Sequence, residues 1–391
     1  MARVGICRHG QISMNSFLRL PMDNTLSMRP GSEQDATVLR VKASSADHPR
    51  PTVTVVIPCF NYARYLPAAV ESVLSQEGVD VDVVVVDDGS TDESMQVALR
   101  FAFNDPRVRV IAHDKNAGPV QTFNDGLAVA EGEFLVRLDA DDILTPGALQ
   151  RATDVMHSFP SVGLVYGHPI HFSGDNLPSP RTTATRWTIW PGRKWLAARC
   201  QNGCNVITSP EVVMRRSVVD QVGGQRELAH THDMEMWLRL SAFADVAYIH
   251  GADQAWHREH SKSLSASVDD LRDFHERRAA FDVLFGGVVG AIPEAETLRK
   301  CANFALARHC LEVAIRLYDH RHVDMQRVKL MACLAREVMP NVEEVPGWRA
   351  LERRMAVGPG KAARHPIFVL ERIYRGLRGR WHKLRWHRAG Y

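Results

Sequence analysis

The feature that most constrains the fold is a strict alternation of strand-like and helix-like segments between residues 51 and 166. Segments with helical spacing of apolar residues separate short β-branched runs, which lie at residues 53–57, 81–86, 108–112, 134–138 and 162–166. This alternation predicts an α/β fold with a parallel sheet and helices on both faces. Ligands of such sheets bind beyond the carboxyl ends of the strands, so the residues after each run are the candidates for a site.

An acidic cluster follows the fourth of these runs. Asp139, Asp141 and Asp142 come directly after the apolar residues 134–138. Carboxylates this close raise one another's proton affinity, so a divalent cation or a ring of hydrogen-bond donors is needed to stabilise them. A hard metal ion is the simplest interpretation. The alternative is that Asp142 caps a helix beginning near Pro146 and that the other two carboxylates are solvated.

The second run also ends in acidic residues. Ser90 and Glu93 have the spacing of a capping box, which predicts a helix from there to about Phe103. Neither of the phosphate-binding patterns GxGxxG and GxxxxGK[ST] follows any strand. A phosphate-containing ligand would therefore be held in another way, and a divalent ion clamped by Asp139 and Asp141 would serve.

The charge of the chain is concentrated in its C-terminal tail. The net charge is +3, but the residues after Gly360 include nine Lys or Arg and only one acidic residue, Glu371. Nucleic-acid binding by the main body is therefore not indicated. Apolar side chains lie on one face of a helix in this tail, which is typical of a helix at an anionic membrane surface. The alternative is a solvated or disordered tail, which Gly376 and Gly379 favour. The apolar residues are Leu370, Ile373, Tyr374, Leu377, Trp381 and Leu384.

The cysteines and the hydropathy pattern indicate a cytoplasmic protein. The seven cysteines are scattered and suggest no disulfide framework, and the pair Cys200 and Cys204 is a weak zinc signal. The first fifty residues lack the apolar core of a secretory signal, and the uncharged run 283–292 is too short to span a bilayer. We expect a cytoplasmic location, with the tail able to hold the protein peripherally at the inner face of the membrane.

Ten short motifs together resemble the family 2 glycosyltransferases with the GT-A fold, over residues 51–265. Each motif is weak alone, but their order and spacing are specific. They are VVIPCFNY (55–62), VVVDDGSTD (84–92), NAG (116–118), NDG (124–126), GEF (132–134), LDADD (138–142), MRR (214–216), GG (223–224), HDMEMWLR (232–239) and REH (258–260).

The resemblance implies a Rossmann-like nucleotide-binding sheet with flanking helices, followed by a helical C-terminal region. Helical periodicity without strand signals from residue 269 to about 339 agrees with this division. We expect a disordered N-terminal extension at 1–50, a GT-A glycosyltransferase domain at 51–267, a helical C-terminal region at 268–358 and a basic amphipathic tail at 359–391.

The resemblance also assigns roles to individual residues. Asp233 would be the catalytic base and Asp141 the direct metal ligand. Asp139 would bind the ribose or the metal through water, and Asp88 the nucleotide base. Other residues that would bind the nucleotide sugar are Pro58, Phe60, Asn61, Asn116, Gly118 and Asn124.

Two positions depart from the family pattern. The family often has Glu before the catalytic Asp, where this chain has His232, and many members have Arg where this chain has Phe123. Arg258 and His260 could replace that missing cation at the diphosphate. For Asp233 the alternative is a carboxylate that only complements a helix dipole, and for His260 it is a position in a surface loop.

The function implied by the resemblance is the inverting transfer of a sugar from a nucleotide-diphosphate sugar to a hydroxyl of a saccharide or lipid-linked acceptor, with Mn²⁺ or Mg²⁺. Polysaccharide or cell-envelope glycan synthesis is the expected context. One alternative is a catalytically inactive scaffold of the same fold. Another is a nucleotidyltransferase, but the loop 58–62 lacks the glycines and the basic residue that such an enzyme needs. A lyase of the DDxxD type is excluded because its acidic residues lie on helices.

Overall fold

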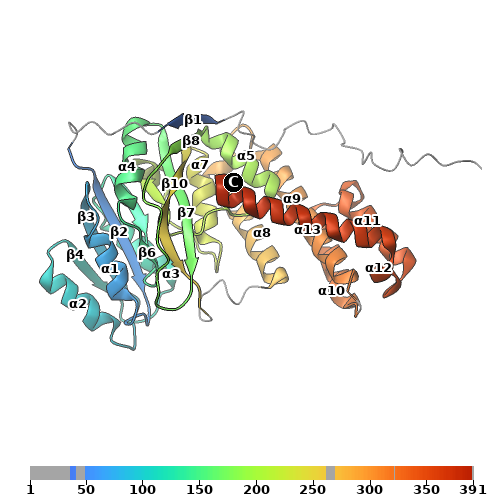
Figure 1. Ribbon diagram of the computed structural model, residues 1–391, viewed down its shortest axis with the longest axis horizontal. Helices are drawn as coiled ribbons and strands as arrows, with labels where there is room; N and C mark the ends of the chain where they lie inside the picture. Colours follow the sequence, from blue (N-terminus) through green and yellow to red (C-terminus); the bar gives the residue numbers. More distant parts are fainter. Residues whose placement is uncertain (1–35, 41–48, 261–268, 321, 390–391) are drawn as a thin grey trace, which may run out of the picture.

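The computed structural model describes residues 36–40, 49–260, 269–320 and 322–389. Figure 1 shows a sheet flanked by helices in the first part of the chain and a group of helices in the last part. The strands are β1 (Thr37–Arg40), β2 (Thr52–Cys59), β3 (Asp80–Asp87), β4 (Val108–Ala112), β5 (Phe134–Arg137), β6 (Ile143–Leu144), β7 (Val162–Phe172), β8 (Arg186–Trp190), β9 (Val213–Arg215) and β10 (Asp245–Arg258).

The strands form one mixed sheet in the order β1-β8-β10-β7-β9-β5-β2-β3-β4, and β6 pairs with β10. β5, β2, β3 and β4 are parallel to one another, as the alternation predicted. β7 runs in the same direction, because β5 and β7 both pair antiparallel with β9, so all five predicted strands are parallel. The sheet is mixed because β9, β8 and β6 run the opposite way. β9 has only three residues, too few to give a strand signal in the sequence.

The N-terminal extension is not entirely without regular structure. Thr37–Arg40 forms β1, which pairs antiparallel with β8 from Thr37 opposite Ile189 to Arg40 opposite Arg186. The prediction of disorder is wrong for these four residues. β8 would otherwise be the sheet edge, and its unpaired backbone groups accept a further strand. The other residues of the predicted extension, apart from 36, 49 and 50, lie outside the described part of the chain.

Helices cover both faces of the sheet, as predicted. They are α1 (Leu66–Leu74), α2 (Ser94–Asn104), α3 (Pro119–Ala128), α4 (Ala148–Ser158), α5 (Gly192–Asn202), α6 (Arg216–Val222) and α7 (His232–Ser241). Alternate residues of β2 enter different cores, because successive strand residues point to opposite faces. Val55 and Ile57 pack with α1 and α4, whereas Val56 packs with α3.

The start of α2 differs from the prediction. The helix begins at Ser94, after Glu93, and no capping box forms. Instead Asp92 Oδ1 accepts a hydrogen bond from the Ser94 N–H at 2.9 Å. Ser90 is not available as a cap, because its Oγ accepts a hydrogen bond from the N–H of Asn61 in the loop after β2. Tertiary contact between the two loops therefore replaces the local cap.

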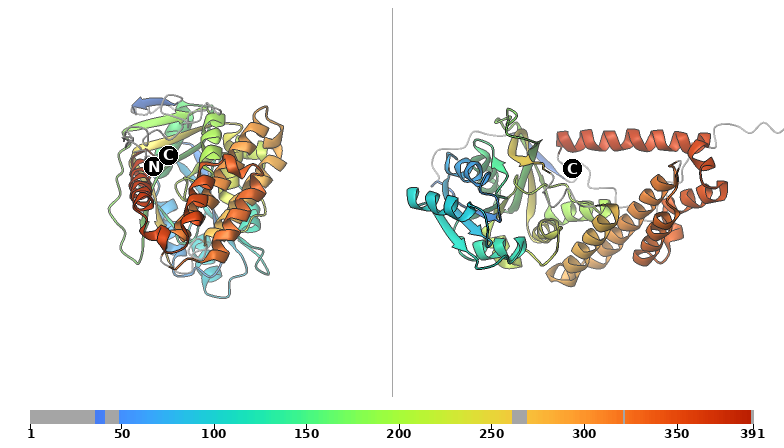
Figure 2. Two further views of the ribbon diagram at one scale, coloured as in Figure 1. Left: turned by 90° about the vertical axis from the view of Figure 1, so that its right-hand side faces the viewer. Right: turned by 90° about the horizontal axis from the view of Figure 1, so that it is seen from below.

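The C-terminal region is helical, as predicted. Its elements are α8 (Asp270–Gly286), a 3₁₀ turn η4 (Val288–Ala291), α9 (Ala295–Tyr318), α10 (Met325–Val338), a 3₁₀ turn η5 (Val342–Glu344), α11 (Pro346–Val357), α12 (Lys361–Arg364) and α13 (Pro366–Ala389). Figure 2 shows α13 as a straight helix along one side of the molecule. Among the described residues, no helix is both long enough and apolar enough to cross a bilayer.

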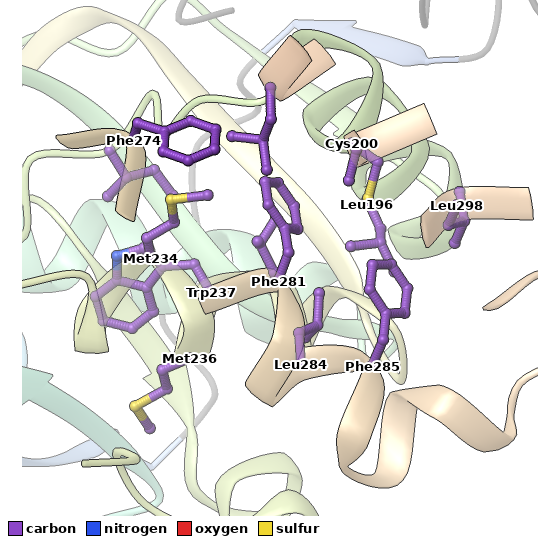
Figure 3. Close-up of a cluster of buried hydrophobic side chains, with 14 of the residues drawn as sticks. Leu196, Cys200, Met234, Met236, Trp237, Phe274, Phe281, Leu284, Phe285 and Leu298 are labelled. Atoms are coloured by element: carbon purple, nitrogen blue, oxygen red, sulfur yellow. The ribbon is translucent and has the colours of Figure 1, made fainter. Parts of the chain in front are cut away.

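The helical region shares one hydrophobic core with the sheet domain. Figure 3 shows Met234 and Trp237 of α7 in the same cluster as Phe274 and Phe281 of α8, with Leu196 of α5. These side chains are almost fully buried. α7 is therefore fixed between the sheet and the helical region, and this packing holds the first turn of α7 in place.

Candidate active site

A cavity of about 1050 Å³ lies beyond the carboxyl ends of the parallel strands β2, β3 and β5. The loops after these strands, the first turn of α7 and the end of β10 all contribute to its wall. The structure thus brings together predicted site residues that are far apart in the sequence. Those on the wall are Pro58, Phe60, Asn61, Asp88, Asn116, Asp139, Asp141, Asp233 and His260.

The loop after β2 is shaped by Asn61, which has a left-handed backbone with φ of +61°. Its side-chain Oδ1 accepts hydrogen bonds from the backbone N–H groups of Thr91, at 2.8 Å, and Asp92, at 3.3 Å. Its own N–H donates to Ser90 Oγ at 2.9 Å. These bonds join the loops after β2 and β3 into one wall, and Phe60 is left 40% exposed beside them. The loop after β3 is also stabilised internally, because Asp87 Oδ2 accepts the N–H of Ser90 at 3.1 Å.

Asp88 is a buried carboxylate at the end of β3. Its Oδ1 accepts the N–H of Ala117 at 2.7 Å and lies 2.8 Å from His113 Nδ1, and its Oδ2 accepts the N–H of Gly118 at 3.0 Å. Burial disfavours ionisation, but these hydrogen bonds outweigh it and hold the pKa of Asp88 below its usual value. Asp88 therefore fixes the start of α3 as an anion.

Asp139 is held by Arg137, a cavity residue that the sequence analysis missed. Arg137 Nε donates to Asp139 Oδ1 at 3.0 Å, and Nη1 donates to Gln225 Oε1 at 2.8 Å. Burial raises the pKa of Asp139, but the charge and hydrogen bond of Arg137 outweigh it, so this pKa lies below its usual value. A basic residue inside an otherwise apolar strand was the signal that could have identified Arg137.

Asp141 has the opposite electrostatic character. Burial, followed by the charges of Asp142 and Asp139, raises the pKa of Asp141 to about 6. Its Oδ2 lies 2.8 Å from His260 Nε2, and the ring of His260 stacks on Tyr65 with 6.0 Å between centroids. A crowded carboxylate of this kind is strongly stabilised by an added cation.

Asp142 lies behind the cavity wall and does not cap the following helix, whose N-cap residue is Gly147. It is 1% exposed, and its Oδ1 accepts the N–H of Arg258 at 2.8 Å. His257 Nδ1 lies 3.2 Å from Oδ2. Burial lowers the pKa of His257, but hydrogen bonding and the charge of Asp142 outweigh it and raise that pKa to about 9. His257 is therefore a cation on the cavity wall at neutral pH.

Arg258 lies behind the cavity wall, where we had expected a contact with the diphosphate. Its guanidinium sits over the rings of Tyr65, at 4.6 Å, and Phe172, at 4.5 Å. Its Nε donates to the backbone carbonyl of Asp141 at 3.0 Å. The Arg258 side chain therefore packs behind the acidic loop at residues 139–142 and stabilises it.

Two other predicted residues also lie off the wall. Asn124 Nδ2 donates to the carbonyl of Gln225 at 2.9 Å, and its Oδ1 accepts the Gln225 N–H at 2.8 Å. Asn124 thus positions the residue that binds Arg137. Gly118 precedes α3 with φ of +90°, and its N–H binds Asp88. Their contact with a nucleotide sugar stays a prediction.

Asp233 lies in the first turn of α7 and is half-buried. Its Oδ1 accepts the N–H of Met234 at 2.6 Å. Burial raises the pKa of Asp233 to about 6; Asp139 also raises it, whereas Arg137 opposes the shift. Burial lowers the pKa of His232 to about 3, so this neutral ring adds no positive charge beside Asp233. A carboxyl group with a pKa near neutrality is suited to general-base chemistry.

A further part of the cavity wall was not marked by any motif. Arg277 reaches it from α8, where its Nη1 donates to the carbonyl of Gly203 at 2.7 Å. The helical region is therefore part of the site. The other residues of this part of the wall are Asn205, Thr208, Ser209, His230 and Thr231.

The donor set suits a divalent metal ion that takes its remaining ligands from a substrate. In the part of the chain that the structure describes, no three His, Cys, Asp or Glu side chains are grouped so as to hold a metal by themselves. Asp141 and His260 nevertheless offer an oxygen and a nitrogen side by side. Mn²⁺ accepts both donor types, Mg²⁺ prefers the oxygen, and both ions commonly bind substrate phosphates.

Sequence comparisons identify relatives of this domain. Residues 54–223 match the profile of Glycosyl transferase family 2. An uncharacterised glycosyltransferase of Nostoc sp. is 40% identical over 114 residues, which cover 29% of this chain and 35% of the relative. The succinoglycan biosynthesis protein ExoO of Rhizobium meliloti is 48% identical over 101 residues, which cover 26% of this chain and 28% of the relative. The matched part spans about a third of the length of these relatives.

A solved structure shares the fold. The structure of residues 1–349 of S. aureus TarS, in complex with UDP-GlcNAc, superposes with a TM-score of 0.54 at 19% sequence identity. The superposition covers 79% of this chain and 92% of the TarS chain. The likeness bears out the GT-A fold expected from the motifs.

Proposed function

We propose that this protein, a member of glycosyl transferase family 2 by its domain at residues 54–223, transfers a sugar from a nucleotide-diphosphate sugar to a hydroxyl acceptor with inversion. One observation carries the proposal. Asp88, Asp141 and Asp233 come from three distant parts of the sequence and line one cavity. The similarity to the succinoglycan biosynthesis protein ExoO supports a role in polysaccharide or cell-envelope glycan synthesis.

The chemistry follows from the electrostatics of the wall. Asp88 stays ionised and would accept a hydrogen bond from the nucleotide base. Asp233 would remove the proton of the acceptor hydroxyl as its oxygen attacks the anomeric carbon. Attack opposite the diphosphate breaks the anomeric bond in the same displacement and inverts the configuration. The cationic His257 would lie on the same wall as the departing negative charge.

Asp141 and His260 would hold Mn²⁺ or Mg²⁺, with Asp139 acting through water. Bound there, the ion would neutralise charge on the leaving diphosphate. Arg137 would keep Asp139 ionised and oriented. The proposed domains are a glycosyltransferase domain at 51–267, a helical region at 268–358 and a basic tail at 359–391. We propose a cytoplasmic location, peripheral at the inner face of the membrane, with a saccharide or lipid-linked acceptor.

A panel of nucleotide-diphosphate sugars tests the function. Release of nucleoside diphosphate and thermal stabilisation would be measured with Mn²⁺, with Mg²⁺ and with a chelator. A ligand at a hundred times its Kd adds about 2.7 kcal/mol to the free energy of unfolding, so the correct donor should raise the melting temperature. Nucleotide release without the metal would refute the metal dependence, and no release with any donor would favour a binding scaffold.

Two substitutions separate the proposed roles. Asp233→Asn should keep donor-induced stabilisation but lose transfer by at least about a hundredfold, since general-base catalysis contributes that much. Asp141→Asn should lose the metal-dependent stabilisation. The matched control is Asp220→Asn, on the exposed surface of α6, which should behave as the parent protein does. Normal turnover of the Asp233→Asn variant would refute the base assignment.

A further inference from the structure

An apolar stripe on α13 faces away from the protein. Its six residues are 55–66% exposed and recur at spacings of three and four, so they lie on one side of the helix. Phe368 and Trp386 lie on the other side, where Phe368 is buried and Trp386 Nε1 donates to the carbonyl of Val206. The six residues of this outer stripe are Leu370, Ile373, Tyr374, Leu377, Trp381 and Leu384.

The charge around the outer stripe has one sign. After Glu371 the helix has no acidic residue, and Arg380 is exposed beside the stripe. Glu371 itself faces inward, where its Oε2 accepts a hydrogen bond from the buried Arg354 at 2.7 Å. The exposed part of α13 therefore presents an apolar stripe, a tryptophan, a tyrosine and only positive charge.

This combination identifies the partner as an anionic lipid surface. A helix that lies in the membrane interface buries its apolar face among the acyl chains and pairs its basic residues with anionic headgroups. Trp and Tyr favour this interface because their rings are apolar and carry one polar group. A second copy of α13 fits poorly, because its basic flanks would face those of the first copy. A partner protein would need an apolar groove with acidic edges that is as long as the stripe, which extends over several helical turns. A membrane surface has no such limit on its length.

The inner side of α13 connects this surface to the cavity. Trp386 binds the carbonyl of Val206, and the preceding residue, Asn205, lies on the cavity wall. The Trp386 ring also lies 6.3 Å from the ring of His171, which lies 5.2 Å from that of His257 on the same wall. The end of the helix is thus packed against the wall of the cavity near Asn205 and His257.

We propose that α13 lies in the surface of an anionic membrane through its outer stripe, and that its contact with residues 205–206 holds the cavity beside the bilayer for a lipid-linked acceptor. This inference rests on the glycosyltransferase function and narrows its acceptor class. A saccharide that is linked to a long hydrocarbon chain stays at the membrane surface. An enzyme bound to the same surface encounters this acceptor at a high effective concentration.

Vesicle binding tests the surface. The full chain would be sedimented with vesicles of phosphatidylglycerol mixed with phosphatidylcholine, and with vesicles of phosphatidylcholine alone. We expect binding to the anionic vesicles, and at least about tenfold weaker binding for the double variant Leu370→Glu, Leu377→Glu. Both residues are largely exposed, so the fold should be kept. The control is Leu99→Glu, Phe103→Glu on α2, which alters two exposed apolar residues elsewhere.

Other outcomes would overturn the proposal. Equal binding of the stripe variant and the parent protein, or no binding by the parent, would exclude a membrane surface. A parent dimer that becomes monomeric in the stripe variant, without vesicle binding, would assign the stripe to a second copy. Arg380→Glu should weaken binding to the anionic vesicles alone, and an equal loss with both vesicle types would contradict the charge argument.

The acceptor class has its own test. Pairs of alkyl glycosides, each with a methyl or a dodecyl group, would be compared as acceptors in the presence of anionic vesicles. We expect the stripe variant to lose transfer to the dodecyl glycoside and to keep transfer to its methyl partner. An equal effect on both would refute the lipid-linked acceptor while leaving the transferase function intact. No transfer to either by the parent protein, together with no nucleotide release, would instead refute the proposed function.

Discussion

Neighbouring aspartates at this site behave differently because their partners differ. Asp139 has the guanidinium of Arg137 within hydrogen-bonding distance, and its pKa falls despite burial. Asp141 has two carboxylates nearby and an imidazole as a hydrogen-bond partner, and its pKa rises to about 6. At the residue scale the site therefore pairs a carboxylate with a lowered pKa, Asp139, with a carboxylate whose raised pKa an added cation would lower, Asp141.

The pKa of Asp233 predicts the pH dependence of transfer. Burial raises this pKa to about 6, and the carboxylate is the active form of a general base, so the rate should rise with pH. Below the pKa, kcat/KM should fall about tenfold per pH unit at saturating metal and acceptor. An exposed aspartate would keep its activity down to about pH 4. The measurement is kcat/KM for the donor against pH, with circular dichroism as a control for unfolding.

A rate that stays constant from about pH 8 to about pH 5 would contradict this prediction, because the base would then have an ordinary pKa. A rate that falls as pH rises through about 6 would point to a general acid instead.

The sequence predicted the anionic residues of the site better than their partners. Asp88, Asp141 and Asp233 follow from short motifs, since strand ends and first helical turns are local features. Arg277 could not be predicted, because only tertiary packing brings α8 to the cavity. Arg258 was expected at the diphosphate, but its side chain packs against Tyr65 and Phe172 behind the cavity wall. A sequence does not show whether a side chain points into a cavity or away from it.

At the scale of elements, the local pattern identified β2, β3, β4, β5 and β7 and was less successful in the later strands. In β10 only residues 246–249 form the apolar run that is typical of a strand, whereas the strand runs from Asp245 to Arg258. The remainder includes Gly251, Asp253 and Gln254, which disfavour a strand locally. Pairing with β7 and β6 stabilises it, and the register with β7 shifts at these residues. The end of β10 carries His257 to the cavity, so this tertiary effect bears on function.

Close packing of α5 against the end of α7 gives a prediction at this scale. A Cβ added at Gly192 would lie 1.9 Å from the carbonyl oxygen of Ala244 and 2.2 Å from that of Ser241. Gly192→Ala should therefore lower the free energy of unfolding by about 2 kcal/mol or more. It should also reduce transfer, because α7 carries Asp233. Denaturant unfolding and a transfer assay measure the two effects.

The matched control is Gly286→Ala at the end of α8, where an added Cβ meets no atom within 4 Å. This change should leave stability unaltered or raise it by up to about 1 kcal/mol, since alanine favours the helix. Equal destabilisation by both substitutions would contradict the packing argument.

At the scale of the molecule, the helical region and α13 are joined by a buried ion network that the sequence did not indicate. Arg354 of α11 is fully buried, and its Nε donates to Asp319 Oδ1 at 2.9 Å after the end of α9. It also binds Glu371 of α13, and Arg375 of α13 binds Asp319. From the sequence alone, an arginine in a basic tail is expected to be solvent-exposed. The partner of Arg375 is Asp319, which lies more than fifty residues earlier in the chain.

Removal of Arg354 tests whether this network attaches α13. Arg354→Met fills similar space but leaves the buried Asp319 and the half-buried Glu371 with fewer partners, so it should lower the free energy of unfolding by about 3 kcal/mol. Arg353→Met is the control, because Arg353 is 60% exposed and its pair with Glu371 should contribute less than about 1 kcal/mol. Hydrogen exchange in α13 would show which part is released. If α13 stays protected in Arg354→Met, its attachment depends instead on Trp386 at the cavity, and the two ends of the helix are held independently.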